Sequence, residues 1–206
     1  FRLDYEYRRF YSAYDQLEET AAFEPLRDLV ENIYTNEYLE TLLPKWNAAI
    51  QEPDSFMALP LQRDFYARNL KNAKERTVVI ISDAMRYEVS KELFRRIQDD
   101  PKCTAKLEVQ LGVLPSYTRL GMAALLPHAE LTMMDDFKVL IDGMPCDNLA
   151  EREAVLHKYS KDSTCVQFDN IKSLKVVELR SIFTGKQVVY VYHNQIDARG
   201  DKPNTE

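Results

Sequence analysis

Three short stretches of the sequence end in side chains that could bind a cation or act on a phosphate. The first holds Asp83, which follows five β-forming residues at 77–81 and stands directly before a helical pattern. A carboxylate here could be the N-cap of that helix. It could also bind a cation or pair with Arg86, because an unpaired carboxylate at a buried strand end is costly. The sequence leaves these three interpretations open.

The second stretch places two hydroxyls just before a short helical pattern. Ser116 and Thr118 stand in the sequence LPSYTRLGMAALLP, where Gly121 leaves room for a ligand or a neighbouring backbone. The N–H groups in the first turn of a helix bind phosphate, so a hydroxyl at this point is well placed for phosphate chemistry. Either hydroxyl could instead cap the helix, and one position can serve as both cap and nucleophile.

The third stretch follows an apolar run and holds two carboxylates and a histidine. Asp197 and Asp201 are four residues apart with Gly200 between them, so a loop that folds back could bring both to one cation. Oxygen ligands suit Mg, Mn or Ca, whereas zinc normally adds histidine. A solvated turn is the alternative for this segment. His193 could orient a ligand or simply end the strand.

These residues can meet only if the elements before them form one sheet. We predict strands at 77–82, 106–114 and 186–193, a hairpin over 129–143, and helices at 85–98, 119–126, 148–161 and 170–183. Continuous Val, Ile and Tyr runs indicate strands covered on both faces, and their alternation with helices indicates a parallel α/β sheet. In such an open sheet, ligands bind beyond the carboxyl ends of the strands.

The chain is predicted to have two parts, an all-helical segment at 1–74 and a sheet-containing part at 75–206. Helices are expected over 5–19, 23–50 and 60–74, with Pro44 breaking the second. The first carries an aromatic stripe with the spacing of one buried helix face, formed by Tyr7, Phe10, Tyr11 and Tyr14. A surface on which nucleic-acid bases stack is the alternative for this stripe.

Composition limits the classes of function. The chain has 206 residues and a net charge of -6, which argues against sequence-independent binding of nucleic acid but leaves a local basic cleft open. Three widely spaced cysteines favour a reducing cytoplasm over a disulfide framework. No apolar run reaches the ~18 residues of a membrane span. Because the chain begins without Met and ends without a closing element, we interpret it as a fragment.

The three stretches together, over residues 76–206, resemble the PglZ family of bacterial phage-exclusion (BREX) defence systems. That family is similar to the alkaline phosphatase superfamily. The resemblance implies an α/β fold, an alkaline-phosphatase-like parallel sheet flanked by helices and incomplete here, preceded by an all-helical N-terminal segment. It also implies other phage-defence proteins as partners and a phosphorylated substrate, such as a nucleotide or nucleic acid. No membrane partner is expected.

The resemblance assigns roles to individual residues. Asp83 matches the metal-binding Asp after the first strand, and Thr118, rather than Ser116, matches the nucleophile, which also binds metal. Asp197 and Asp201 match ligands of the other metal. Asp201 stands where the phosphodiesterases have His, so Mn or Mg becomes an alternative to Zn. His193 has no clear counterpart in the family pattern. It could orient a ligand from beside the site, as could Ser116, or it could simply end the strand.

The implied activity is that of a phosphatase or phosphodiesterase with two divalent metal ions in the full-length protein. The family's further Asp-His pair and histidine have no match here, since His128 and His157 stand at other places. We therefore expect residues 1–206 alone to bind metal weakly and to have negligible activity. Two alternatives remain: a non-catalytic metal- or nucleotide-binding scaffold within the defence complex, and a mutase acting on a small phosphosugar.

Overall fold

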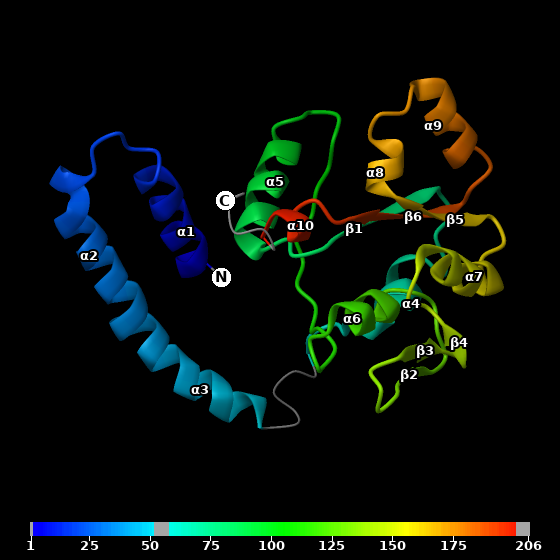
Figure 1. The fold of residues 1–206 in the computed structure, drawn as a ribbon, viewed down its shortest axis with the longest axis horizontal. Helices are drawn as coiled ribbons and strands as arrows, with labels where there is room; N and C mark the ends of the chain where they lie inside the picture. Colours follow the sequence, from blue (N-terminus) through cyan, green and yellow to red (C-terminus); the bar gives the residue numbers. More distant parts are fainter. Residues whose placement is uncertain (1, 52–57, 201–206) are drawn as a thin grey trace. The chain divides into compact units, whose positions relative to one another are not determined.

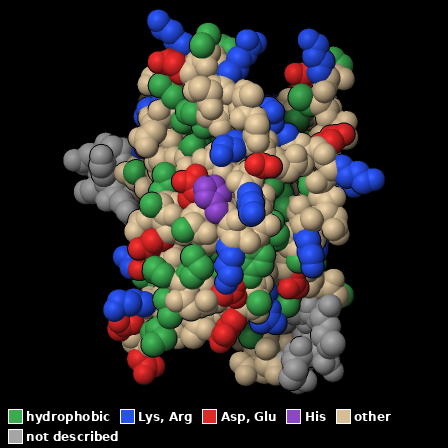
Figure 2. Space-filling view, turned by 90° about the vertical axis from the view of Figure 1, so that its right-hand side faces the viewer, with side chains coloured by type: hydrophobic (Ala, Val, Ile, Leu, Met, Phe, Trp, Pro, Cys, Tyr) green, Lys and Arg blue, Asp and Glu red, His purple; other side chains and the backbone are tan. Residues whose placement is uncertain are grey.

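The computed structural model describes residues 2–51 and 58–200, and the chain divides into two compact units (Figure 1). The first unit comprises Phe1–Ala58 and Arg86–Val109, and the second comprises Leu59–Met85 and Gln110–Glu206. Within the described ranges, none of the helices is both long and apolar enough to cross a membrane. Basic, acidic and apolar side chains are interspersed over the face that Figure 2 shows.

The first unit is helical, as predicted. It contains α1 (Arg2–Tyr14), η1 (Ala21–Phe23), α2 (Glu24–Asn32), the π-helix η2 (Ile33–Leu39), α3 (Glu40–Ile50) and α5 (Tyr87–Gln98). The predicted break at Pro44 was wrong, because Pro44 lies inside α3. A proline in a helix removes one backbone hydrogen bond and kinks the helix without always ending it.

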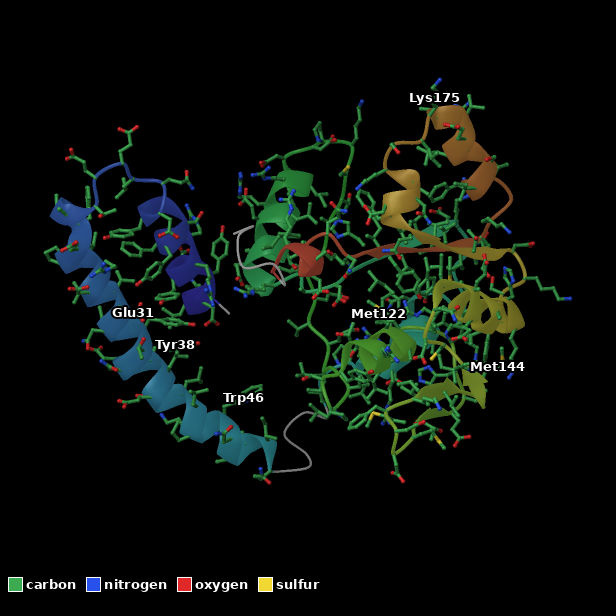
Figure 3. The ribbon with its side chains drawn as sticks, in the orientation of Figure 1. Glu31, Tyr38, Trp46, Met122, Met144 and Lys175 are labelled. Carbon is green, nitrogen blue, oxygen red and sulfur yellow. The ribbon has the colours of Figure 1, made fainter. Side chains whose placement is uncertain are left out.

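The aromatic stripe of α1 packs against the next helices of this unit. Tyr14 is buried, whereas the other three rings are partly exposed. The ring of Tyr7 stacks on that of Tyr34, with centroids 3.7 Å apart. The Tyr7 and Tyr11 hydroxyls donate to the carboxylate of Glu31 on α2 at 2.7 and 2.5 Å; Figure 3 labels Glu31 and, on η2, Tyr38. The stripe is therefore a packing face that carries a polar rim.

The second unit is built on a three-stranded parallel sheet with the order β1-β6-β5. Its strands are β1 (Thr77–Ser82), β6 (Val188–His193) and β5 (Ser163–Gln167), and the central strand β6 is almost fully buried. Ser82 pairs with His193, so β1 and β6 end at the same edge. The predicted parallel α/β class is confirmed.

Helices cover both faces of this sheet (Figure 1). α8 (Phe168–Ile171) and α9 (Val176–Phe183) pack on one face against Val189 and Val191. The other face carries α4 (Phe65–Asn69), α6 (Thr118–Ala124) and α7 (Leu149–Tyr159), around a core that contains Tyr190 and Leu156. Met122 from α6 and Met144 from β4 pack against this core (Figure 3). The described part of this unit also contains η4 (Gln62–Asp64) and α10 (Asp197–Gly200).

The predicted hairpin forms, but two other predictions of local structure were wrong. The hairpin is the antiparallel sheet β2 (Leu131–Met133), β3 (Val139–Ile141) and β4 (Met144–Pro145). The predicted strand 106–114 makes a single bridge, Leu61 to Leu111, because the 60–62 segment takes its backbone hydrogen bonds. The predicted helix 170–183 is interrupted at 172–175, which separates α8 from α9.

The compact units do not follow the predicted segments 1–74 and 75–206. Residues 59–74 belong to the sheet unit, whereas 86–109, which include α5, belong to the helical unit. A compact unit need not be a domain, so the predicted domain boundary stays a prediction.

Asp142 connects three segments of the second unit. Its Oδ1 accepts hydrogen bonds from the N–H groups of Ala129 at 3.0 Å and Glu130 at 2.8 Å, and its Oδ2 accepts one from the Tyr159 hydroxyl. Burial tends to raise the pKa of this carboxyl, but these hydrogen bonds and Lys158 outweigh burial and lower the pKa to about 2 from 3.8. The resulting stabilisation is present above the ordinary pKa and is lost as pH falls towards the lowered value.

We expect Asp142→Asn to lower the free energy of unfolding by about 2 kcal/mol at neutral pH, because hydrogen bonds to a charged acceptor are the stronger ones. Asn keeps the shape and tolerates the positive φ of 51° at this position. Urea unfolding followed by circular dichroism measures the difference, with Asp135→Asn at an exposed position as control. The difference should shrink when the pH is lowered to about 3; an unchanged difference would contradict the assignment.

Candidate functional site

A cavity of about 360 Å³ in the second unit brings together residues from two of the three predicted stretches. Asp83, Ser116 and Thr118 all line it. Its remaining walls come from Gln62, Ile81, Ser82, Gly112, Val113, Tyr117, Gly121, Met122 and Leu125. A carboxylate and two hydroxyls that are distant in the sequence therefore share one small space at the end of β1.

Asp83 extends β1 by one residue. Its N–H donates to the His193 carbonyl at 3.0 Å, which continues the pairing between β1 and β6. Its carboxylate accepts a hydrogen bond from the N–H of Ala84 at 3.0 Å, and Ala84 has a positive φ of 58°. Non-glycine residues with positive φ are uncommon and concentrate at functional sites. Since α5 begins only at Tyr87, with Arg86 as its N-cap, Asp83 does not cap it.

The two hydroxyls do not cap α6 either. The N-cap of α6 is Tyr117, which makes no side-chain capping hydrogen bond, and Thr118 is the first residue of the helix. Within the described part of the chain, neither the Ser116 nor the Thr118 hydroxyl has a hydrogen-bond partner. The Thr118 hydroxyl is thus available to a ligand. α6 has only seven residues. We therefore do not treat the N–H groups at its N-terminus as a phosphate site by themselves.

His193 acts as a structural link at the ends of two strands. Its Nδ1 lies 2.9 Å from the Ser82 Oγ, and its ring meets the Phe168 ring edge to face at 4.8 Å. Ser82, which pattern analysis passed over, lines the cavity next to Asp83. These contacts hold the end of β1 against the end of β6.

The third predicted stretch is only partly placed. Asp197 is the first residue of α10, and it follows β6 at the same edge of the sheet as Asp83. It is not among the residues that line the cavity. Asp201 lies outside the described residues. The structure therefore brings together Asp83, Ser116 and Thr118, and places Asp197 beyond the neighbouring strand.

Gln62 was missed by pattern analysis, and it fixes the position of α6. Its Nε2 donates to the Gly121 carbonyl at 3.0 Å, and its Oε1 accepts from the Val113 N–H at 3.0 Å. The side chain thus joins the helix that begins at Thr118 to the segment before it. No sequence signal points to this role, because a glutamine in a short helical pattern is ordinary.

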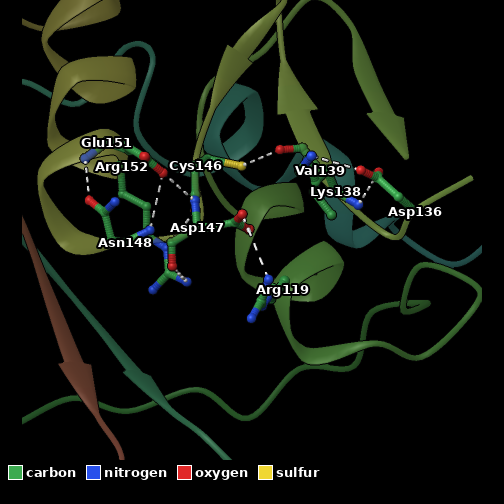
Figure 4. A network of polar contacts seen from close by, with 9 residues as sticks. All are labelled: Arg119, Asp136, Lys138, Val139, Cys146, Asp147, Asn148, Glu151 and Arg152. Atoms are coloured by element: carbon green, nitrogen blue, oxygen red, sulfur yellow. Dashed lines mark hydrogen bonds and ion pairs between the residues drawn. The ribbon is translucent and has the colours of Figure 1, made fainter. Parts of the chain in front are cut away.

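The N-terminal end of α6 is linked to the segment between β4 and α7. The Arg119 guanidinium lies 3.7 Å from the Asp147 carboxylate (Figure 4). Asp147 precedes Asn148, which caps α7 in a capping box with Glu151. Arg152 donates to the Cys146 and Asp147 carbonyls at 3.0 and 3.1 Å. This network links Arg119, the residue after Thr118, to the capped start of α7.

The cavity offers oxygen donors of the type that hard divalent cations prefer. They are the Asp83 carboxylate and the hydroxyls of Thr118 and Ser116. Over residues 2–51 and 58–200, no three His, Cys, Asp or Glu side chains gather as a metal site would require. The donor chemistry of these three side chains is compatible with a divalent cation.

Comparison with known proteins decides the family. A family model described as the BREX system PglZ alkaline phosphatase-like domain matches residues 64–206. The chain belongs to the PglZ family. The match includes Asp83, Thr118 and Asp197, whereas Gln62 lies just outside it.

Two curated members of the PglZ family are similar along the whole chain. The identity is 42% to the alkaline phosphatase-like protein PglZ of Bacillus cereus (strain H3081.97), over 99% of this chain and 25% of that protein. It is 36% to the alkaline phosphatase-like protein BrxZ of Escherichia coli O9:H4 (strain HS), over 100% of this chain and 25% of that protein. The chain thus spans about a quarter of these PglZ relatives. No solved structure matches the chain.

Proposed function

We propose that this chain provides the nucleophile and part of the metal site of a metal-dependent phosphatase or phosphodiesterase in a bacterial phage-defence (BREX) protein. The observation that supports this most strongly is that Asp83 and Thr118 line one cavity, with the Thr118 hydroxyl unpartnered among the described residues. A residue that serves only as a helix cap would use its hydroxyl in the capping hydrogen bond, and Thr118 does not.

In this proposal the Thr118 Oγ1 attacks the phosphorus of a phosphate ester. A bond forms between Oγ1 and phosphorus while the bond from phosphorus to the leaving-group oxygen breaks. The Thr118 hydroxyl proton is lost to solvent, and the leaving group departs with the electron pair of the broken bond. Water then attacks the phosphothreonine, which releases phosphate or a phosphomonoester and restores the hydroxyl.

Asp83 and Thr118 would hold one divalent cation, and Asp197 and Asp201 would contribute to the second. Such cations lower the pKa of hydroxyl groups and water bound to them, and neutralise charge on the phosphate oxygens. The oxygen-only set favours Mn or Mg alongside Zn. His193 and Ser116 would support this site from beside it, His193 through the Ser82 hydroxyl, 2.9 Å from its ring.

A non-catalytic scaffold that binds a metal or nucleotide is the second candidate. It is favoured by one observation, that no three metal-binding side chains gather among residues 2–51 and 58–200. Under either candidate, we propose other phage-defence proteins as partners and a phosphorylated substrate such as a nucleotide or nucleic acid. The free cysteines Cys103, Cys146 and Cys165 support placing the protein in the cytoplasm.

Removal of metal separates the two candidates. We expect full-length protein to hydrolyse bis-p-nitrophenyl phosphate, to lose at least about 100-fold in rate after treatment with a chelator, and to recover with Mn²⁺, Mg²⁺ or Zn²⁺. Release of p-nitrophenol measures the rate, and buffer with each metal alone is the control. Absence of turnover with every metal would favour the scaffold, and turnover that a chelator leaves unchanged would contradict metal dependence.

A further inference from the structure

A second cavity of the sheet unit adjoins the candidate site. Its volume is about 670 Å³, against about 360 Å³ for the cavity that contains Asp83 and Thr118. Three residues line both cavities, Gln62, Gly112 and Val113. The two spaces therefore share one wall.

This shared wall is held in place by hydrogen bonds. The Gln62 side chain donates to the Gly121 carbonyl and accepts from the Val113 N–H, both at 3.0 Å. At Gly112 the backbone lies close to this side chain, since a Cβ there would be 3.5 Å from the Gln62 Oε1. These hydrogen bonds hold in place the residues along which the second cavity adjoins the cavity that contains Thr118.

The second cavity is lined by apolar and polar surface in about equal amounts, and its polar side chains are Gln62, Arg63, Asp64 and His128. Its apolar side chains are those of Leu61, Ala67, Leu111, Val113, Leu114, Pro115, Leu120, Ala129, Leu131 and Met133. Arg63, which lines it, has a guanidinium without an ion pair or hydrogen bond to any described residue. His128 also lines it, with Nδ1 2.7 Å from the Leu126 carbonyl. A carbonyl only accepts, so Nδ1 carries the proton and Nε2 of the neutral ring is an acceptor.

We propose that this second cavity binds a ring-bearing substituent, of the nucleoside type, on a phosphodiester whose phosphorus lies beside Thr118. The inference rests on the proposed function and adds the class of substrate to it. The volume falls within the range of about 300–1,000 Å³ that small organic ligands occupy. Apolar walls suit the faces of a ring, the Arg63 guanidinium suits a ring carbonyl, and the His128 Nε2 suits a ring N–H. Thymine offers both groups on one edge.

Three chromogenic phosphodiesters with the same leaving group test whether the second cavity binds the remaining substituent. The p-nitrophenyl esters of methyl phosphate, phenyl phosphate and thymidine 5′-phosphate all release p-nitrophenol and differ only in the substituent that remains. With full-length protein we expect kcat/KM to rise about tenfold from the methyl to the thymidine ester, with the phenyl ester between them. Equal values for all three would overturn the inference.

Blocking the cavity gives the matched comparison. Ala129→Trp places a large ring in the second cavity, at an exposed residue that does not line the Thr118 cavity. It should lower kcat/KM for the thymidine ester about tenfold and change the methyl ester less than about twofold. Ala150→Trp is the control, because Ala150 is exposed on α7 and lines neither cavity. Ala67→Trp, from α4, tests the same cavity in case the first variant does not fold.

A binding measurement tests the nucleoside site independently of whether the protein hydrolyses phosphate esters. If no ester is hydrolysed, the proposed function fails, and calorimetric titration with thymidine 5′-phosphate then decides the inference. Binding to wild type that Ala129→Trp weakens about tenfold, and Ala150→Trp does not, would uphold the cavity as a nucleoside site. No binding, or equal binding by all three proteins, would overturn it.

Discussion

Replacing Thr118 by Ala in the full-length protein is expected to lower kcat for phosphate-ester hydrolysis by about 10³-fold or more. The variant loses the side-chain oxygen that attacks phosphorus in the first step of the proposed reaction. KM should change much less, because the remaining walls of the cavity, including Asp83 and Gly121, are intact. Initial rates with bis-p-nitrophenyl phosphate at saturating metal measure both constants.

Two further variants make this expectation specific. Thr118→Ser keeps a hydroxyl and should retain activity well above that of the Ala variant. Thr184→Ala removes a threonine hydroxyl at an exposed position after α9, away from the cavity, and should behave as wild type. Turnover that Thr118→Ala leaves unchanged would exclude Thr118 as the nucleophile.

Asp83→Asn is expected to produce a loss of similar size, about 10³-fold in kcat, together with weaker metal binding. Asn keeps the size of the side chain and the acceptor for the Ala84 N–H, which lies 3.0 Å from the carboxylate in wild type. The variant therefore removes a charge with little change in packing. Metal titrations of activity and of calorimetric heat should both shift to higher metal concentration.

The stability of Asp83→Asn without metal is a second measurement, and here the variant is expected to equal or exceed wild type. A carboxylate at a partly buried strand end, held beside an alanine with a φ of 58°, costs stability until a cation neutralises it. Without metal, the variant should unfold at a temperature equal to or above that of wild type, and added metal should stabilise wild type more. Asp135→Asn, exposed in the hairpin, is the control with the same change in charge. Equal activity, metal affinity and metal-dependent stability in wild type and variant would remove Asp83 from the site.

The parts of the fold that the sequence predicted have strong and continuous apolar signals. β1 and β6 are runs of Val, Ile and Tyr, and each was predicted over the residues at which it forms or within two of them. Their parallel pairing places Asp83 and Asp197 beyond the same edge, as a parallel sheet requires. The position of Asp83 followed from local pattern alone.

The parts that the sequence did not predict depend on contacts distant in the chain. β5 was missed because Ser163–Gln167 is short and holds only two apolar residues, Cys165 and Val166, which stand next to each other and give no strand pattern. The segment 106–114 alternates like a strand, yet it has no partner beyond the 60–62 backbone. A period-two pattern indicates a strand only where another strand can pair with it.

The candidate site also depends on contacts between residues that are distant in the sequence. Placing Thr118 beside Asp83 required the Gln62 side chain, which joins α6 to the segment before it across 59 residues of sequence. The second cavity requires Arg63 and His128 to lie on one surface, although they belong to different elements. Such convergence is set by tertiary packing and has no local signature.

Acid-quenched mass spectrometry tests the central claim most directly. Full-length protein mixed with a phosphate ester and divalent metal, then quenched in acid and digested, should yield a peptide phosphorylated on Thr118. The phosphopeptide should be absent from Thr118→Ala and from samples quenched before substrate is added. Phosphorylation of another residue, or turnover with no phosphorylated peptide in rapidly quenched samples, would contradict the account.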